Sequence, residues 1–187
     1  GDSLFLASIV ALDPDDGSYV WHYQSSPGET WDHTATQQIV LADLQIDGAK
    51  RRVVMQAPKN GFFYVLDAKT GQLISAKNFT DVSWATHIDL NTGRPVLSPD
   101  MLPRLLAGET LEVWPSRGTN ATLIAFNPKT GLVYINSWNL ARVMKYVEAK
   151  FALGRGYTGI TSSGLFPKGE PKGYHMAMEP LTGKVVW

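Results

Sequence analysis

The feature that most constrains this chain is a turn pattern that occurs five times. In each copy, an apolar pair is followed by an acidic or amide residue, a short polar step and a glycine. An Asx side chain in this place accepts hydrogen bonds from backbone N–H groups two or three residues on, and glycine supplies the positive φ before the next strand. The pattern therefore predicts β-hairpins around residues 11–17, 65–71, 87–93, 125–131 and 177–183.

The spacing of these turns favours a β-propeller. Successive repeat glycines lie 54, 22, 38 and 52 residues apart, and a four-stranded propeller blade takes about 40–50 residues. Three spacings fit one blade each, whereas the step of 22 residues predicts an extra hairpin or a closely spaced turn inside one blade. A generic meander of hairpins would give the same pattern. Trp21 and Trp187 each follow a repeat glycine by four residues, which suits a flat side chain that docks one sheet against the next.

The strand candidates between the turns are short and rich in β-branched or aromatic residues. Residues 139–151 are ambiguous, because their composition also tolerates a helix. We predict that two stretches rich in proline or glycine, residues 97–116 and 154–173, are loops. The clearest strands are residues 39–41, 52–55 and 61–66. The predicted fold class is all-β: one propeller domain over residues 1–187 without an internal boundary, holding about three and a half to four antiparallel four-stranded blades.

Composition excludes several classes of function. The 17 Lys and Arg residues balance 17 Asp and Glu residues, so neither a strongly basic nucleic-acid-binding surface nor an acidic tail is predicted. No stretch approaches the roughly 20 apolar residues that span a bilayer as a helix. Because the chain has no cysteine, thiol nucleophiles, disulfides and Cys-ligated metals are excluded within it.

Three polar segments are candidates for a site. Trp31 and Asp32 follow a Pro-Gly turn, which places a carboxylate beside an indole. A turn aspartate that caps a backbone N–H would explain Asp32 without any chemistry. Lys59 stands on a turn before the strand at residues 61–66, where a solvated lysine is equally common, and Asn120 belongs to a third polar turn.

Taken together, these segments and the repeats resemble the quinoprotein alcohol dehydrogenases, the methanol and ethanol dehydrogenase family that uses pyrroloquinoline quinone (PQQ). The resemblance extends over almost the whole chain and is closest over the first 95 residues. That family folds as an eight-bladed propeller, so the resemblance implies that this chain is roughly the middle third of such a subunit and is inactive alone. The segments that carry it are residues 1–5, 8–13, 21–24, 31–32, 36–38 and 57–67.

The resemblance implies roles for single residues. Asp32 matches the family's catalytic base, which takes the alcohol proton as hydride moves to the quinone, and it lies beside the metal. Lys59 matches the basic residue at the ortho-quinone oxygens, where a fixed cation stabilises developing negative charge. Asn120 falls where the family often has an Asn-Trp pair near the cofactor, although Ala121 replaces that Trp here.

The resemblance also implies the cofactors and partners. Lanthanide-using members have an Asp where this chain has Thr34, and without that extra hard oxygen ligand Ca²⁺ is the expected metal. The other metal ligands would precede residue 1. The implied function is oxidation of alcohols to aldehydes in the periplasm, with a cytochrome c or another electron acceptor.

Two other functions fit parts of the sequence. A non-catalytic periplasmic propeller that serves as a scaffold or binding module would share the repeats, but it has no use for a carboxylate and a lysine aimed at one cavity. A sugar-oxidising quinoprotein would share the propeller and the cofactor, but it is less expected to contain the stretch from Trp21 to Asp32.

Overall fold

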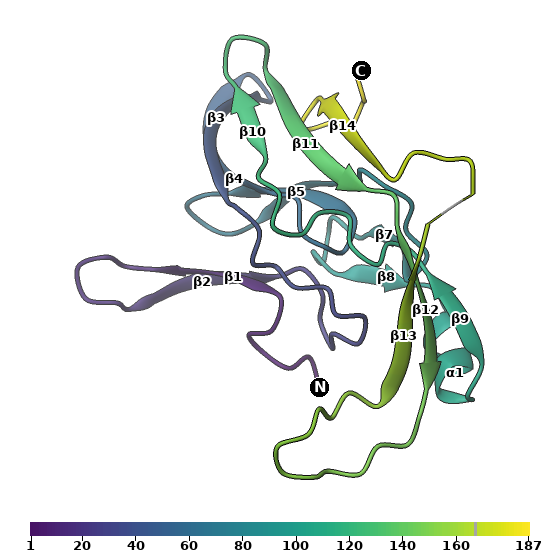
Figure 1. The fold of residues 1–187 in the computed structure, drawn as a ribbon. Helices are drawn as coiled ribbons and strands as arrows, with labels where there is room; N and C mark the ends of the chain where they lie inside the picture. The colour runs from purple at the N-terminus through teal and green to yellow at the C-terminus, as the bar shows by residue number, and fades with distance from the viewer. Residues whose placement is uncertain (167) are drawn as a thin grey trace.

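The computed structural model describes residues 1–166 and 168–187 and is almost entirely β-structure (Figure 1). One short helix, α1 (Met101–Leu106), is present in this part of the chain. The strands of the described residues are β1 (Ser8–Leu12), β2 (Tyr19–Gln24), β3 (Val40–Ile46), β4 (Ala49–Gln56), β5 (Phe62–Asp67), β6 (Leu73–Asn78), β7 (Ala85–Ile88), β8 (Pro95–Leu97), β9 (Thr110–Val113), β10 (Ala125–Asn127), β11 (Leu132–Trp138), β12 (Ala141–Tyr146), β13 (Ile160–Leu165) and β14 (Gly173–Met178).

All paired strands are antiparallel, as predicted. Strands β3, β4, β5 and β6 form a four-stranded meander in chain order, which is the arrangement of one propeller blade. Two three-stranded sheets have the orders β10-β11-β14 and β13-β12-β9, and β1-β2 and β7-β8 are two-stranded. The all-β fold class is therefore confirmed.

The repeat turns have the predicted geometry. The five repeat glycines have φ values between 71° and 75°, and each glycine N–H donates to the carbonyl of the residue four positions earlier. In four turns the Oδ1 atom of the Asx residue accepts the N–H two residues on, at 2.9 to 3.0 Å. Glu179 has a longer side chain, and in the fifth turn its Oε2 accepts the hydroxyl of Thr182 instead.

The 22-residue step is an extra hairpin, because its glycine lies in the turn between β7 and β8. It forms a sheet of its own rather than part of a larger blade. Trp21 docks as predicted: its indole covers Gly71, and Nε1 donates to the carbonyl of Ala68 at 3.2 Å. The ring of Trp187 lies against Tyr134 and His175, and its docking on another sheet stays a prediction.

Both loop predictions are wrong in part. Residues 97–116 contain helix α1 and strand β9. Pro103 does not prevent the helix because it lies in the first turn, where a backbone N–H has no intrahelical partner. Residues 154–173, of which residue 167 lies outside the described part, contain the largely exposed strand β13. The ambiguous residues 139–151 contain the strand β12, which is paired on both sides.

Strand β5 is the centre of the buried core. Phe62, Tyr64 and Leu66 join one hydrophobic cluster, and Phe63 and Val65 join the other. Because alternate side chains of a strand point to opposite faces, β5 is covered on both faces of its sheet. The turn that enters β5 is therefore held on a rigid element. No helix among the described residues is long and apolar enough to cross a membrane.

Candidate active site

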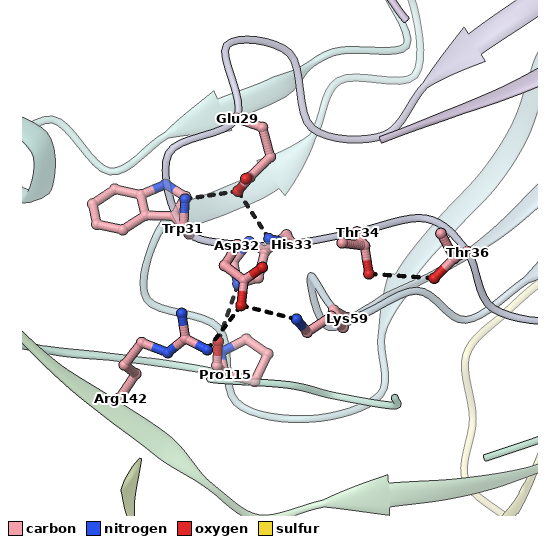
Figure 2. A network of polar contacts seen from close by, with 9 residues as sticks. All are labelled: Glu29, Trp31, Asp32, His33, Thr34, Thr36, Lys59, Pro115 and Arg142. Atoms are coloured by element: carbon pink, nitrogen blue, oxygen red, sulfur yellow. Dashed lines mark hydrogen bonds and ion pairs between the residues drawn. The ribbon is translucent and has the colours of Figure 1, made fainter. Parts of the chain in front are cut away.

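Two of the predicted site residues meet in space. The carboxylate oxygen Oδ2 of Asp32 accepts a hydrogen bond from Nζ of Lys59 at 3.1 Å (Figure 2). The same oxygen accepts a second one from a terminal nitrogen of Arg142 at 3.0 Å. The side chain of Asp32 is 54% exposed, whereas those of Lys59 and Arg142 are only 10% and 14% exposed. The site is therefore an accessible carboxylate held by two nearly buried cations.

Asp32 has an uncommon backbone conformation, with φ of 63°. Such a conformation costs a non-glycine residue about 1–3 kcal/mol and persists only where the surrounding structure fixes it. Here Oε1 of Glu29 accepts the backbone N–H groups of Trp31 and His33, at 2.6 and 2.9 Å, on either side of Asp32. These contacts hold the carboxylate at the tip of the turn.

His33 anchors the same turn to a distant segment. Its imidazole is buried beside Trp84, and Nε2 donates to the carbonyl of Pro115 at 3.1 Å. Since a carbonyl can only accept, the proton is on Nε2. Burial lowers the pKa of His33 to about 4, so the ring is neutral at neutral pH and adds no charge beside Asp32.

Lys59 is placed by the buried turn that enters β5. The carbonyl of Lys59 accepts the N–H of Gly118 at 2.8 Å. The next residue, Asn60, is fully buried: its Nδ2 donates to the hydroxyl of Tyr64 at 2.8 Å, and its carbonyl accepts Nε1 of Trp84 at 2.9 Å. A lysine on such a turn has little freedom to leave the site.

The two cations fix the charge state of Asp32. Partial burial alone would raise its pKa, but hydrogen bonds and charge from Lys59 and Arg142 outweigh this effect and hold the pKa below its usual value. The carboxylate is therefore ionised at neutral pH, as a general base must be. With one anion and two cations, the three side chains carry a net charge of about +1.

The third predicted residue lies apart from this network. Asn120 is exposed and belongs to the loop that follows Gly118 and Thr119, which bond to the carbonyls of Lys59 and Ala57. The loop is thus joined to the Lys59 turn, but the side chain of Asn120 makes no hydrogen bond within residues 1–166 and 168–187.

Sequence reasoning missed Arg142, Glu29 and His33. Arg142 and Asp32 are 110 residues apart, and nothing in the segment around Arg142 indicates its partner. Glu29 and His33 flank Asp32 closely, so the local acidic and aromatic pattern could have suggested a clamp, whereas the bond to Pro115 could not have been foreseen.

A calcium ion takes six to eight oxygen ligands, and the described residues contain no group of three or more His, Cys, Asp or Glu side chains that could hold a metal ion. Asp32 fits as one ligand because its Oδ1 makes no hydrogen bond in the described part of the chain, and an ionised carboxylate oxygen has two lone pairs, one for a metal and one for a proton donor. Thr34, two residues on, bears an exposed hydroxyl that accepts from Thr36 at 3.5 Å. This segment therefore offers one carboxylate to a metal.

Comparisons with known proteins agree with the fold. Residues 1–84 match the PQQ family, which is described as the glucose/ethanol/alcohol dehydrogenase β-propeller domain. The chain is 44% identical over its whole length to quinohemoprotein alcohol dehydrogenase ADH IIB of Pseudomonas putida, covering 27% of that protein. It is 39% identical over its whole length to 1-butanol dehydrogenase (cytochrome c) of Thauera butanivorans, covering 28% of it.

Similarity to a solved structure is equally extensive. A europium-containing methanol dehydrogenase superposes on the whole chain with a TM-score of 0.88 and 32% identity, and the chain covers 33% of it. This level of likeness confirms the propeller architecture. The chain thus spans between about a quarter and a third of the length of these relatives.

Proposed function

Because this chain belongs to the family of PQQ-dependent quinoprotein alcohol dehydrogenases, we propose that it forms one side of a PQQ site that oxidises alcohols to aldehydes. The observation that carries the proposal is the contact of 3.1 Å between the half-exposed carboxylate of Asp32 and the nearly buried ammonium of Lys59. A scaffold propeller gains little from this arrangement, because burying two cations has a desolvation cost that one carboxylate offsets only in part.

Asp32 acts as the general base in this proposal. Its ionised carboxylate takes the hydroxyl proton of the alcohol while hydride leaves the adjacent carbon. When bound, PQQ supplies the electrophilic quinone that accepts the hydride. Lys59 donates hydrogen bonds at the edge of the cofactor, where its fixed charge stabilises negative charge on oxygen. The low exposure of Lys59 strengthens that interaction because little water competes for the ammonium group.

We assign the metal as Ca²⁺ rather than a lanthanide, with Asp32 beside it. The hydroxyl of Thr34 is neutral, and it cannot supply the additional anionic oxygen that an Asp at this position would give a trivalent ion. Asn120 is assigned to the cofactor side of the loop joined to Lys59. The name of the Thauera relative favours a cytochrome c as electron acceptor, and a periplasmic location suits such a partner.

The test uses the full-length protein, reconstituted with PQQ and Ca²⁺ and assayed on primary alcohols with an artificial electron acceptor. The variant Asp32→Asn removes the base and is expected to lower kcat by about 10²–10⁴-fold while PQQ stays bound. Lys59→Met is expected to lower PQQ retention. Asp47→Asn is the matched control, because Asp47 also has a positive φ, of 51°, but lies at the tip of the β3–β4 hairpin.

One result would contradict the role of Asp32, and two others would favour one of the alternative functions. Unchanged turnover in Asp32→Asn would show that this carboxylate is not the base. A wild-type protein that takes up neither PQQ nor Ca²⁺ would favour the scaffold alternative. Turnover on aldose sugars with none on alcohols would favour the sugar-oxidising alternative.

A further inference from the structure

Arg142 is the part of the site that the sequence pattern does not explain. It lies on β12, the central strand of the sheet β13-β12-β9, and its backbone is paired with Val113 on one side and Gly164 on the other. Its neighbour Ala141 is fully buried. The guanidinium therefore projects from a rigid strand, and it reaches Asp32 across the site from the side opposite the Lys59 turn (Figure 2).

Strand β12 and the Asp32 turn are also connected through a second path. The backbone N–H of Ser116 donates to the carbonyl of Leu140 at 2.7 Å, immediately before β12. The adjacent residue, Pro115, accepts the hydrogen bond from His33, which follows Asp32 directly. The backbone beside Asp32 is thus connected by hydrogen bonds to the start of β12, the strand that also carries Arg142.

The two cations make the hydrogen bonding of the two carboxylate oxygens of Asp32 unequal. Both donate to Oδ2, whereas Oδ1 makes no hydrogen bond within the described residues. One hydrogen bond leaves a carboxylate free to swing about its donor, but two donors from different elements fix both its position and its plane. Lys59 alone cannot fix the position and plane of the carboxylate, because in the proposed function Lys59 donates hydrogen bonds to the cofactor.

We propose that Arg142 is a positioning residue for the oxidation, which holds Oδ2 of Asp32 so that Oδ1 faces the alcohol. This inference rests on the proposed role of Asp32 as base. The proton of the alcohol hydroxyl passes to Oδ1 as the hydride leaves the carbon, and Arg142 itself exchanges no proton. Arg142 acts only through Asp32, so its removal must have no effect once Asp32 can no longer accept a proton.

The test compares Arg142→Met with Arg51→Met in the full-length protein carrying PQQ and Ca²⁺. Arg51 makes a similar ion pair, at 2.7 Å to Asp67, in a sheet that does not contribute Asp32. We expect Arg142→Met to lower kcat on 1-butanol by about 10–100-fold, as expected for a misplacement of the base of about 1 Å. KM and bound PQQ should stay close to their wild-type values, and Arg51→Met should retain full turnover.

Further measurements separate positioning from a merely structural role. Arg142→Lys keeps the charge and should restore part of kcat. In the Asp32→Asn background, Arg142→Met should cause no additional loss, because residues that act as a unit are non-additive. A crystal structure of Arg142→Met should show the Asp32 carboxylate rotated from its wild-type position.

The outcomes also separate this inference from the proposed function. If Asp32→Asn abolishes turnover but Arg142→Met retains the wild-type kcat, the positioning role is wrong and the base assignment stands. The same conclusion follows if Arg142→Met lowers the residual rate of Asp32→Asn by its full factor, since Arg142 would then act independently of Asp32. If Asp32→Asn keeps its turnover, the proposed function itself is wrong.

Discussion

Substitution of Gly71 tests how tightly the sheets are docked. Gly71 has φ of 72°, and a Cβ atom added there would lie 2.5 and 2.6 Å from Cε3 and Cδ2 of Trp21. Carbon atoms in contact normally lie about 3.5–4.0 Å apart, so the indole must retreat by about 1 Å. That movement would also break the hydrogen bond of 3.2 Å from Trp21 to Ala68.

A matched glycine isolates the packing contribution. Gly131 occupies the same position in another repeat turn, with φ of 71°, and nothing lies within 4 Å of its added Cβ. Gly131→Ala should therefore lower the free energy of unfolding only through the left-handed backbone conformation, by about 1–2 kcal/mol. Gly71→Ala has this cost and a further cost of about 1–3 kcal/mol for overpacking, which gives a loss of about 2–5 kcal/mol in the free energy of unfolding.

The assay is urea denaturation of the full-length protein and the two variants, followed by circular dichroism. We expect a clearly lower midpoint for Gly71→Ala than for Gly131→Ala. The double variant Gly71→Ala/Trp21→Leu should lose less than the sum of its single changes, because the smaller side chain relieves the clash. Equal midpoints for the two glycine variants would refute the view that Trp21 is tightly docked on this turn.

Two other predictions concern buried contacts. Trp84→Phe keeps an aromatic ring but removes the indole N–H, which leaves the buried backbone carbonyl of Asn60 without its donor. The free energy of unfolding should fall by about 1–3 kcal/mol, which would appear as a lower urea midpoint. Asp67 should contribute to acid sensitivity: the hydrogen bond from Arg51 lowers its pKa below 3.8, so its stabilisation is present above that pH and is lost as the pH falls through the native pKa. A midpoint measured from pH 6 downward should fall less steeply for Asp67→Asn than for wild type; parallel curves would contradict this.

The sequence was sufficient for features that depend on neighbouring residues. Asp13 and Gly17 stand close enough in the chain to close a turn by themselves, and the same holds for the other four repeats. The strand at residues 61–66 was evident from its unbroken aromatic and β-branched run. By contrast, the polar strand β13 carries no alternation, because it is exposed along most of its length and gains its structure from pairing with β12.

For the site, the resemblance to a family predicted one carboxylate and one lysine, and the fold places the side chains of Asp32 and Lys59 3.1 Å apart. Only the tertiary structure decided that Arg142, 110 residues further along the chain, completes the grip on Asp32. It also decided that His33 is buried and bonded to Pro115. Local patterns record which turn a segment makes, whereas the meeting of two side chains from separate sheets depends on how those sheets pack.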